Sequence, residues 1–447
     1  MIQQKKQFTN LNDFLSSSHA SHTDIEINIS NNHNYSQNFD YLTSALQKCT
    51  NIKNLTLSLI NLNLGDQQLS NLGLALTNCS QITTLSLQLC QNQIGPEGVQ
   101  SLSLLLTKYN SLSSLSLNLV GNRIQHQGIS DIGQALVKCT NLAFLTLIVD
   151  QNQIGDEGIS NLGQALEKCI NLTKLVLGIG WNKIGPQGGQ NLSSSLAKCS
   201  HLTSLELLLH NNQIGPQCVS NLGLDLTNCS NLSTLKLNIS KNKIGSQGAS
   251  DLCVGFTKFT QLKTLSLNLQ DNQIQSQGVI GLGSALGKCT NISHLTVNIN
   301  QNQISDEDII DFGSKLSNCT NLHFLSLFLC NLNLKSTSGL NQILKCCNKI
   351  STLTLYLSNN LICNENVSSL GLALANCSNI QTLTLNLDYN QIGNLGAKNL
   401  ISGLVKSAHL LKSLLYLRYN QVDELQKKKL KKQIIKAKRL VINFAFL

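Results

Sequence analysis

A repeat of about thirty residues runs through most of the chain and limits its fold more than any other feature. A cysteine, or an aromatic residue in its place, stands every 30 residues from Cys49 to Cys319; Cys347 follows after 28 residues and Cys377 after another 30. A period in this range is typical of a solenoid, in which each repeat buries its apolar face against its neighbours. No Pro-rich or Ser-rich linker interrupts the period within the 447 residues, so we expect one elongated domain.

Each repeat contains the patterns of one strand and one helix. In the repeat that begins at Cys169, Leu175 and Leu177 alternate with other residues, as in a strand with one buried face. Leu192 and Leu196 lie four residues apart behind two glycines, which suits a short helix with a narrow apolar stripe. Strands pack about 4.8 Å apart and helices about 8–10 Å apart, so the stack must bend with its sheet inside. We therefore predict an α/β fold, a right-handed horseshoe with a concave parallel sheet of about 14 strands and convex helices.

These residues resemble a known family. The pattern L-x-x-L-x-L, then Asn, I-G-x-x-G and L-x-x-x-L, resembles the leucine-rich repeat of the ribonuclease-inhibitor type, and it recurs as Leu205, Leu207, Asn212, Ile214 and Gly215. The cysteine before each strand is similar to the cysteine-containing leucine-rich repeats of F-box proteins. Here a further apolar residue precedes the asparagine, so the strand segment is two residues longer than in the usual motif, by extension of the strand or by a bulge.

An asparagine closes the strand segment in eleven repeats: Asn92, Asn122, Asn152, Asn182, Asn212, Asn242, Asn272, Asn302, Asn360, Asn390 and Asn420. The resemblance implies a ladder in which each amide satisfies buried backbone groups of the neighbouring turn. Leu62 and Leu332 stand at this position in two repeats, where we expect local irregularity.

The cysteines indicate packing and not chemistry. Ten of the 16 occupy the repeat position, where Tyr109 and Phe259 substitute, and no C-x-x-C pair occurs. We therefore expect neither a disulfide framework nor a metal site. Residues 1–23 lack the apolar core of an export signal, and no stretch reaches the length of about 18 apolar residues that spans a membrane. We expect an intracellular, cytoplasmic protein.

Catalytic motifs are missing from the sequence. It contains neither H-E-x-x-H nor G-x-S-x-G, its nine histidines are scattered, and only 13% of its residues are charged. We predict a protein that is not an enzyme, with no cofactor and no small-molecule substrate.

Three segments follow from composition. Residues 1–23 are polar, with a Ser-rich part that favours partial disorder; residues 24–423 hold the solenoid; residues 424–447 form a basic amphipathic capping helix and tail. Leu430, Ile434, Ala437 and Val441 define the apolar face of that helix. Eleven Lys and Arg against two acids from residue 405 onward give +9 of the formal +10.

The opposite face of this helix is a candidate binding site for a polyanion or an anionic membrane surface, and its alternative role is that of a solvated cap. Its basic residues are Lys427, Lys428, Lys431, Lys432, Lys436, Lys438 and Arg439.

Residues between the buried leucines point out of the concave sheet, and most are Ser, Thr or Asn. Two islands differ, and we expect them to anchor a protein partner, although cross-strand packing alone would also explain them. The first island is Phe144, Ile148, Lys174, Val176, Trp181, Glu206, Leu208 and His210. The second island is Phe324, Phe328, Tyr356, Tyr389, Tyr416, Arg418 and Tyr419.

The preferred hypothesis is a non-catalytic scaffold that binds a protein partner on the concave face. The resemblance implies two alternatives, a regulator of a small GTPase and an inhibitor like the ribonuclease inhibitors. A solenoid that is nearly neutral apart from a basic end is poorly suited to a basic ribonuclease. A tether to polyanions or membranes through the basic helix is compatible with any of these.

Overall fold

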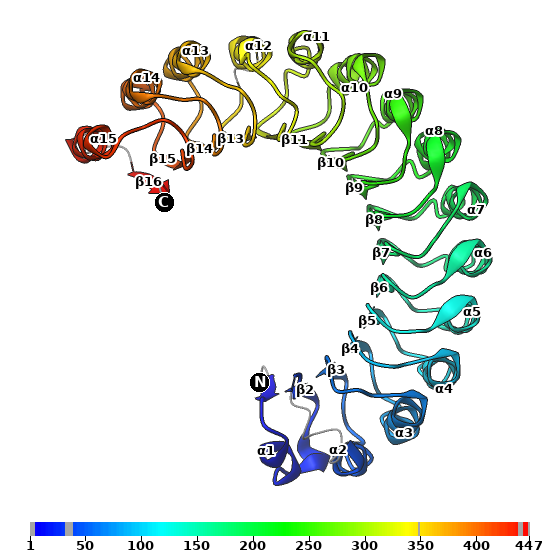
Figure 1. Cartoon of the computed structure of the whole chain (residues 1–447). Helices are drawn as coiled ribbons and strands as arrows, with labels where there is room; N and C mark the ends of the chain where they lie inside the picture. Colours follow the sequence, from blue (N-terminus) through cyan, green and yellow to red (C-terminus); the bar gives the residue numbers. More distant parts are fainter. Residues whose placement is uncertain (1–4, 32–38, 347–348, 437–440, 446–447) are drawn as a thin grey trace. The chain divides into compact units, whose positions relative to one another are not determined.

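A computed structural model describes residues 5–31, 39–346, 349–436 and 441–445. It divides the chain into two compact units, Met1–Ile214 with Asn228–Leu232, and Gly215–Thr227 with Ser233–Leu447. Within each unit a parallel strand and a helix alternate along the chain, and neighbouring strands follow the sequence order. Figure 1 labels these elements.

The first unit contains eight strands and seven α-helices in its described part. The strands are β1 (Lys6–Phe8), β2 (Asp24–Asn28), β3 (Asn54–Ser58), β4 (Thr84–Gln88), β5 (Ser114–Asn118), β6 (Phe144–Ile148), β7 (Lys174–Gly178) and β8 (Ser204–Leu208). The helices are α1 (Leu11–Leu15), α2 (Phe39–Leu46), α3 (Asp66–Leu76), α4 (Pro96–Leu106), α5 (Gln125–Lys138), α6 (Gly155–Leu166) and α7 (Pro186–Leu196), with a 3-10 turn at His19–Ser21.

The second unit contains the remaining strands and helices. Its strands are β9 (Thr234–Asn238), β10 (Thr264–Asn268), β11 (His294–Asn298), β12 (Phe324–Phe328), β13 (Thr352–Tyr356), β14 (Thr382–Asn386), β15 (Lys412–Tyr416) and β16 (Val441–Ala445). Its helices are α8 (Gly215–Asp225), α9 (Gly245–Phe256), α10 (Ser276–Lys288), α11 (Asp306–Leu316), α12 (Ser338–Cys346), α13 (Asn364–Ala375), α14 (Asn394–Lys406) and α15 (Glu424–Lys436), and a 3-10 turn at Leu226–Asn228 follows α8.

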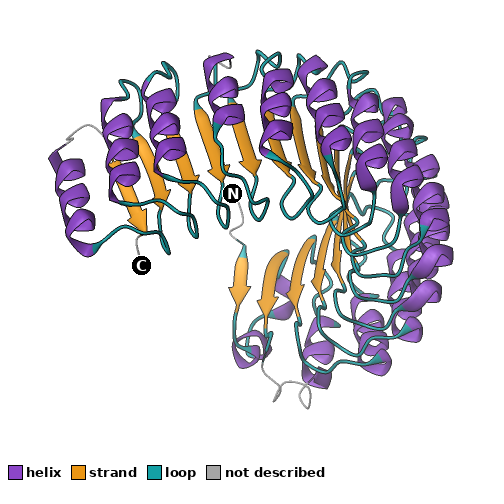
Figure 2. Cartoon of the chain, turned by 45° about the horizontal axis from the view of Figure 1, so that its top comes forward, coloured by secondary structure: helices purple, strands orange, loops and turns teal. Residues whose placement is uncertain are grey.

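The strand leucines build the core because the register between repeats does not slip. Leu115 pairs with Leu145, and Leu145 with Leu175, so identical positions stack from strand to strand. All three are at most 2% exposed, and full burial of a leucine contributes about 1.5–3 kcal/mol. Within each unit the helices cover one face of the strands and leave the other uncovered (Figure 2). The uncovered face carries the residues that lie between the leucines.

The additional apolar residue of the strand segment extends the pairing and makes no bulge. Beyond the end of β7, the Ile179 N–H donates to the Leu208 carbonyl at 2.9 Å, and the Trp181 N–H donates to the His210 carbonyl at 3.0 Å. Ile179 is fully buried. The sheet hydrogen bonding therefore continues to the residue before the asparagine.

The asparagine ladder is confirmed. The Asn182 side chain is fully buried; its Oδ1 accepts from the Asn152 N–H at 2.8 Å and its Nδ2 donates to the Val149 carbonyl at 2.9 Å. The irregularity expected at Leu62 is not seen. The register of β3 with β4 is unbroken, and the Leu62 N–H donates to Asn92 Oδ1 at 3.0 Å.

The sequence predicted about 14 strands. The part of the chain that the structure describes contains 16. The two additional strands are β1, where Lys6 pairs with Ile25, and β16, where Val441 pairs with Lys412. Neither segment carries the repeat motif, so the period could not reveal them.

The basic helix was expected to include Val441, and this was wrong. α15 ends at Lys436, and Val441–Ala445 is strand β16. This mainly apolar segment, with Asn443 as its one polar residue, lies beside the open edge of β15 and gains backbone hydrogen bonds there that a helix could not make with that edge. Within residues 5–23, α1 buries Leu11 and Phe14. The limits 1–23, 24–423 and 424–447 stay a prediction.

Candidate interaction surface

The uncovered face of β6, β7 and β8 carries the first island. Phe144 is 43% exposed and pairs with Lys174 on the next strand, whose Nζ lies 5.3 Å from the centre of the phenyl ring. Val176 pairs with Glu206, and both are half-buried. An ammonium above an aromatic ring is attracted to the face of the ring, so Lys174 and Phe144 form one mixed surface.

Two glycines shape the middle of the first island. A Cβ atom at Gly178 would lie 2.9 Å from Ile148 Cγ2, and a Cβ atom at Gly180 would overlap the His210 imidazole. Ile148 and His210 therefore lie over the backbone of the neighbouring repeat, which any larger residue would prevent. The sequence placed these residues in one island, and the structure brings them together from both sides of one repeat.

Asp150 belongs to the same place and was missed by the sequence analysis. Its Oδ1 accepts from the Gly180 N–H at 2.6 Å. Burial raises the pKa of the Asp150 carboxyl, while the Gly180 hydrogen bond and the nearby His210 lower it. The signal that could have found it is positional, because Asp150, Gly180 and His210 stand 30 residues apart at one repeat position.

Trp181 has a left-handed backbone conformation, with φ 56°, and its side chain is 53% exposed. The residues one repeat before and after it, Gln151 and Asn211, have φ 58° and 55°. The fold therefore imposes this conformation on the position. Asparagine and glycine tolerate it best, and a bulky aromatic residue there is unusual.

In the second island, two aromatic residues at this same position of successive repeats also have the left-handed backbone conformation. Tyr389 and Tyr419 have φ 55° and 56° and are 52% and 64% exposed. Their rings stack with centroids 4.2 Å apart and an interplanar angle of 14°. The two tyrosines present one flat aromatic surface.

Other members of the second island form separate clusters. Phe328 and Tyr356 stack at 4.7 Å across β12 and β13. Phe324 instead stacks on His294 at 4.3 Å, at the opposite end of β12. Four residues of a strand span about 13 Å, so Phe324 is not in the cluster of Phe328. His294 was missed because a single histidine in a strand gave no signal.

Arg418 is held by a carboxylate that the sequence analysis also missed. Its Nε and Nη2 donate to Asp388 Oδ2 at 2.9 and 2.6 Å, and its backbone N–H donates to Asp388 Oδ1 at 2.7 Å. The guanidinium carbon lies 5.5 Å from the centre of the Tyr416 ring. The ion pair orients Arg418 beside the tyrosines.

Comparison with known proteins identifies the repeat. A family model described as a leucine-rich repeat matches residues 78–103, 141–163, 231–253, 263–283 and 379–400, which lie in both units. The chain is a leucine-rich repeat protein. Among solved structures, it is similar to "Crystal structure of Rad7 and Elc1 complex in yeast", with 17% identity, coverage of 87% of this chain and 85% of that chain, and a TM-score of 0.48. No curated protein matches the sequence.

The basic helix of this leucine-rich repeat protein exposes most of its described lysines. Leu430 is buried, whereas Lys428, Lys431 and Lys432 are exposed. Lys427 is half-buried, and its Nζ donates to Glu424 at 2.7 Å. The sequence analysis omitted Lys429, which is also exposed.

Three basic candidates on this helix remain without a side-chain description. The backbone of Lys436 ends α15, and its side chain is outside the described part; Lys438 and Arg439 lie outside the described residues altogether.

Seven of the nine repeat cysteines that the structure of this leucine-rich repeat protein describes are buried, and Cys169 and Cys377 are partly buried. Burial raises the pKa of Cys79 and Cys139 to about 11 and that of Cys49 and Cys199 to about 12. The 14 cysteines whose side chains the structure describes are all free. Over the described ranges, no three His, Cys, Asp or Glu side chains are grouped as a metal ion requires, and no helix combines the length and apolarity of a membrane span.

Proposed function

We propose that this leucine-rich repeat protein is a non-catalytic scaffold that binds a protein partner on the uncovered face of its strands, with the two islands as anchors. The observation that carries this proposal is the placement of Trp181, Tyr389 and Tyr419, three half-exposed aromatic side chains, at positions of left-handed backbone.

Folding alone does not favour these residues. The left-handed conformation costs an L-residue about 1–2 kcal/mol, and strain of this kind clusters at functional sites. Asn211 and Asn359 show which residue suits the same conformation, with φ 55° and 56°. Stacking between Tyr389 and Tyr419 recovers about 0.5–1.5 kcal/mol, but the exposed parts of the rings gain nothing from burial. Tryptophan and tyrosine are frequent anchors of protein interfaces, so binding of a partner would explain these aromatic side chains at strained positions.

A capture experiment tests the proposal. Proteins bound by the wild type are compared with those bound by Trp181→Asn and by the double variant Tyr389→Asn/Tyr419→Asn. The matched controls are Leu74→Ser on α3 and Leu372→Ser on α13, which remove equally exposed apolar side chains, 69% and 65%, from the helix layer.

Loss of a specific partner in the island variants, with retention in both controls, is the expected result. An identical set of bound proteins in all five samples would overturn the proposal, because neither island would then anchor anything.

A second candidate function rests on α15, which presents Lys428, Lys431 and Lys432 to solvent while Leu430 is buried. This arrangement supports attraction to a polyanion or an anionic membrane surface. The ribonuclease-inhibitor-like subtype and the regulation of a small GTPase remain predictions from the resemblance. We also infer a cytoplasmic location, where buried thiols stay reduced.

A further inference from the structure

Two exposed leucines lie beside the basic residues of α15, at a position where the repeats of α3 to α13 have a polar residue. Leu395 is in the first turn of α14 and Leu425 in the first turn of α15, and their side chains are 60% and 64% exposed. In the eleven repeats from α3 to α13, ten have glutamine or glutamate here, from Gln67 to Glu365, and one has Thr337. The last two repeats therefore place an apolar residue where the others keep a polar one in solvent.

The two leucines are neighbours, because the helices that carry them are joined at two places. At the helix starts, Asn394 Nδ2 donates to Asp423 Oδ2 at 2.5 Å, and the Asp423 N–H donates to Asn394 Oδ1 at 3.0 Å. Further along, Gln433 Nε2 donates to Ser402 Oγ at 3.1 Å. Adjacent helices pack about 8–10 Å apart, so the two leucines lie side by side at one end of a shared helix face.

Lysines continue this face along both helices. Residues three, four and seven positions after a helical residue lie on the same side of the helix. At these distances from the leucines stand four exposed lysines: Lys398 on α14, and Lys428, Lys429 and Lys432 on α15. Helix α14 contains no acidic residue and α15 contains only Glu424, whose carboxylate pairs with Lys427 at 2.7 Å. The face is therefore cationic, with an apolar end.

This combination favours a membrane over a water-soluble polyanion. Lysines attract the anionic groups of either ligand. An exposed leucine, in contrast, is stabilised only when it leaves water. A bilayer has an apolar interior beneath its anionic headgroups, whereas a sulfated or phosphorylated chain such as heparin has none. Apolar side chains bordered by lysines are typical of helices that bind at the surface of an anionic membrane.

We propose that the face formed by Leu395, Leu425 and these four lysines binds the surface of a bilayer that contains anionic lipid. The lysines lie among the headgroups, and the two leucines at the starts of α14 and α15 insert below them. The inference rests on the second candidate function proposed above and names its ligand. It is independent of the partner surface on the strands.

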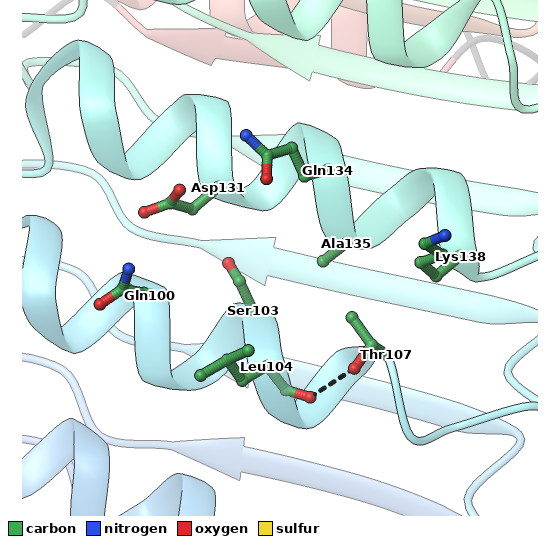
Figure 3. A pocket seen from close by; sticks show the side chains of 8 residues that line it. All are labelled: Gln100, Ser103, Leu104, Thr107, Asp131, Gln134, Ala135 and Lys138. Atoms are coloured by element: carbon green, nitrogen blue, oxygen red, sulfur yellow. Dashed lines mark hydrogen bonds between the residues drawn. The ribbon is translucent and has the colours of Figure 1, made fainter.

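Exposed leucines elsewhere in the helix layer provide a control. Leu104 on α4 is 62% exposed and borders a groove of about 220 Å³ between α4 and α5, where Asp131 and Lys138 on α5 oppose each other in charge (Figure 3). Leu74 has the equivalent position on α3 and is 69% exposed. Helices α3 and α4 contain no lysine or arginine. These two leucines are as exposed as Leu395 and Leu425 but have no basic residue on their own helices.

Co-sedimentation of the full chain with vesicles of equal parts phosphatidylserine and phosphatidylcholine tests the proposal. We expect binding to these vesicles and far weaker binding to vesicles of phosphatidylcholine alone. Leu395→Gln/Leu425→Gln, which restores the usual residue of the position, should weaken binding to the anionic vesicles at least about tenfold, because two apolar side chains no longer leave water. Leu74→Gln/Leu104→Gln should bind them as the wild type does, and circular dichroism establishes that both variants are folded.

Elution from a heparin column separates this inference from the function on which it rests. Both leucine variants should elute at the salt concentration of the wild type, because heparin has no apolar interior. Equal vesicle binding by the wild type and Leu395→Gln/Leu425→Gln, or no vesicle binding by the wild type, overturns the inference. If heparin still retains the wild type in that case, the face belongs to a soluble polyanion and the second candidate function stands; if heparin does not retain it, both fail. A loss of heparin binding by Leu395→Gln/Leu425→Gln as large as its loss of vesicle binding also overturns the inference, since the leucines would then act through the basic residues and not on lipid.

Discussion

The guanidinium of Arg418 lies on the carboxylate of Asp388, with Nη2 2.6 Å from Oδ2, and the two residues occupy the same position in successive repeats. Asp388 is 3% exposed, while Arg418 reaches the surface beside Tyr416. The buried acid satisfies the Arg418 backbone N–H as well as its side chain. This ion pair therefore fixes the Arg418 guanidinium at the surface and also joins two successive repeats.

Replacing Arg418 by methionine should lower the melting temperature, because Asp388 would stay buried without its cation. Arg418→Met/Asp388→Ser should recover part of the loss, since Ser240 and Ser358 already occupy this position in other repeats. Lys198→Met is the control, because Lys198 is 65% exposed in its pair with Glu167 and ion pairs at the surface contribute little. Equal melting temperatures for Arg418→Met and Lys198→Met would contradict the prediction.

Trp181→Asn should raise the free energy of unfolding by about 1 kcal/mol, because asparagine tolerates the left-handed conformation that tryptophan resists. Urea denaturation measures the change. Gln151→Asn, at the same position one repeat earlier with φ 58°, is the control and should gain less because glutamine is smaller and unbranched. If Trp181→Asn proves less stable than the wild type, the ring stabilises the fold by packing. Its strained conformation would then be no evidence for a binding anchor.

Asn182→Ala should reduce the free energy of unfolding by about 2–4 kcal/mol, since buried backbone groups on two repeats would lose their partner. The affected groups include the Asn152 N–H and the Val149 carbonyl. Asn171→Ala removes an exposed bond between repeats, from Asn171 Nδ2 to the Thr140 carbonyl at 2.7 Å, and should cost less than about 1 kcal/mol. Similar losses at the two sites would show that burial of the ladder is unimportant.

Among the cysteines whose side chains the structure describes, Cys363 should react first with iodoacetamide. Hydrogen bonds from the Asn366 backbone and side chain lower the pKa of its thiol, whereas burial raises the pKa of Cys377 to about 11. A lowered pKa means more thiolate at a given pH, so near pH 8 Cys363 should react at least about 100-fold faster than Cys377. Mass spectrometry after timed alkylation measures both rates. Asn366→Ala removes the side-chain hydrogen bond and keeps the backbone one, so it should shift the alkylation profile of Cys363 moderately to higher pH; an unchanged profile would refute the contribution of the Asn366 side chain.

The triple variant Lys428→Gln, Lys431→Gln, Lys432→Gln should elute from a heparin column at lower salt than the wild type. Each phosphate-like contact removed should reduce the slope of log affinity against log salt by about 0.9. Lys48, Lys108 and Lys258, all exposed at the ends of other helices, provide a control variant with the same change in charge. An equal decrease of the eluting salt concentration in both variants would show that net charge, and not a site on α15, determines heparin binding.

The period by itself determined the alternation of strand and helix, the buried leucines and the asparagine ladder. It could do so because the positions of Leu175 and Asn182 have equivalent neighbours from one repeat to the next. An equivalent environment favours the same residue type each time. The islands were partly accessible for the same reason, since residues such as Trp181 and Tyr419 stand out against the residues that usually occupy their positions.

Only the tertiary structure decided what depends on contacts between unlike residues of neighbouring repeats. Asp388 under Arg418 and His210 over Gly180 each need residues thirty positions apart to meet in one geometry. β16 is the same case, because Val441 pairs with Lys412 across an intervening helix. The repeat tells which positions face one another, but side-chain size, burial and hydrogen bonding at each place decide which of them interact.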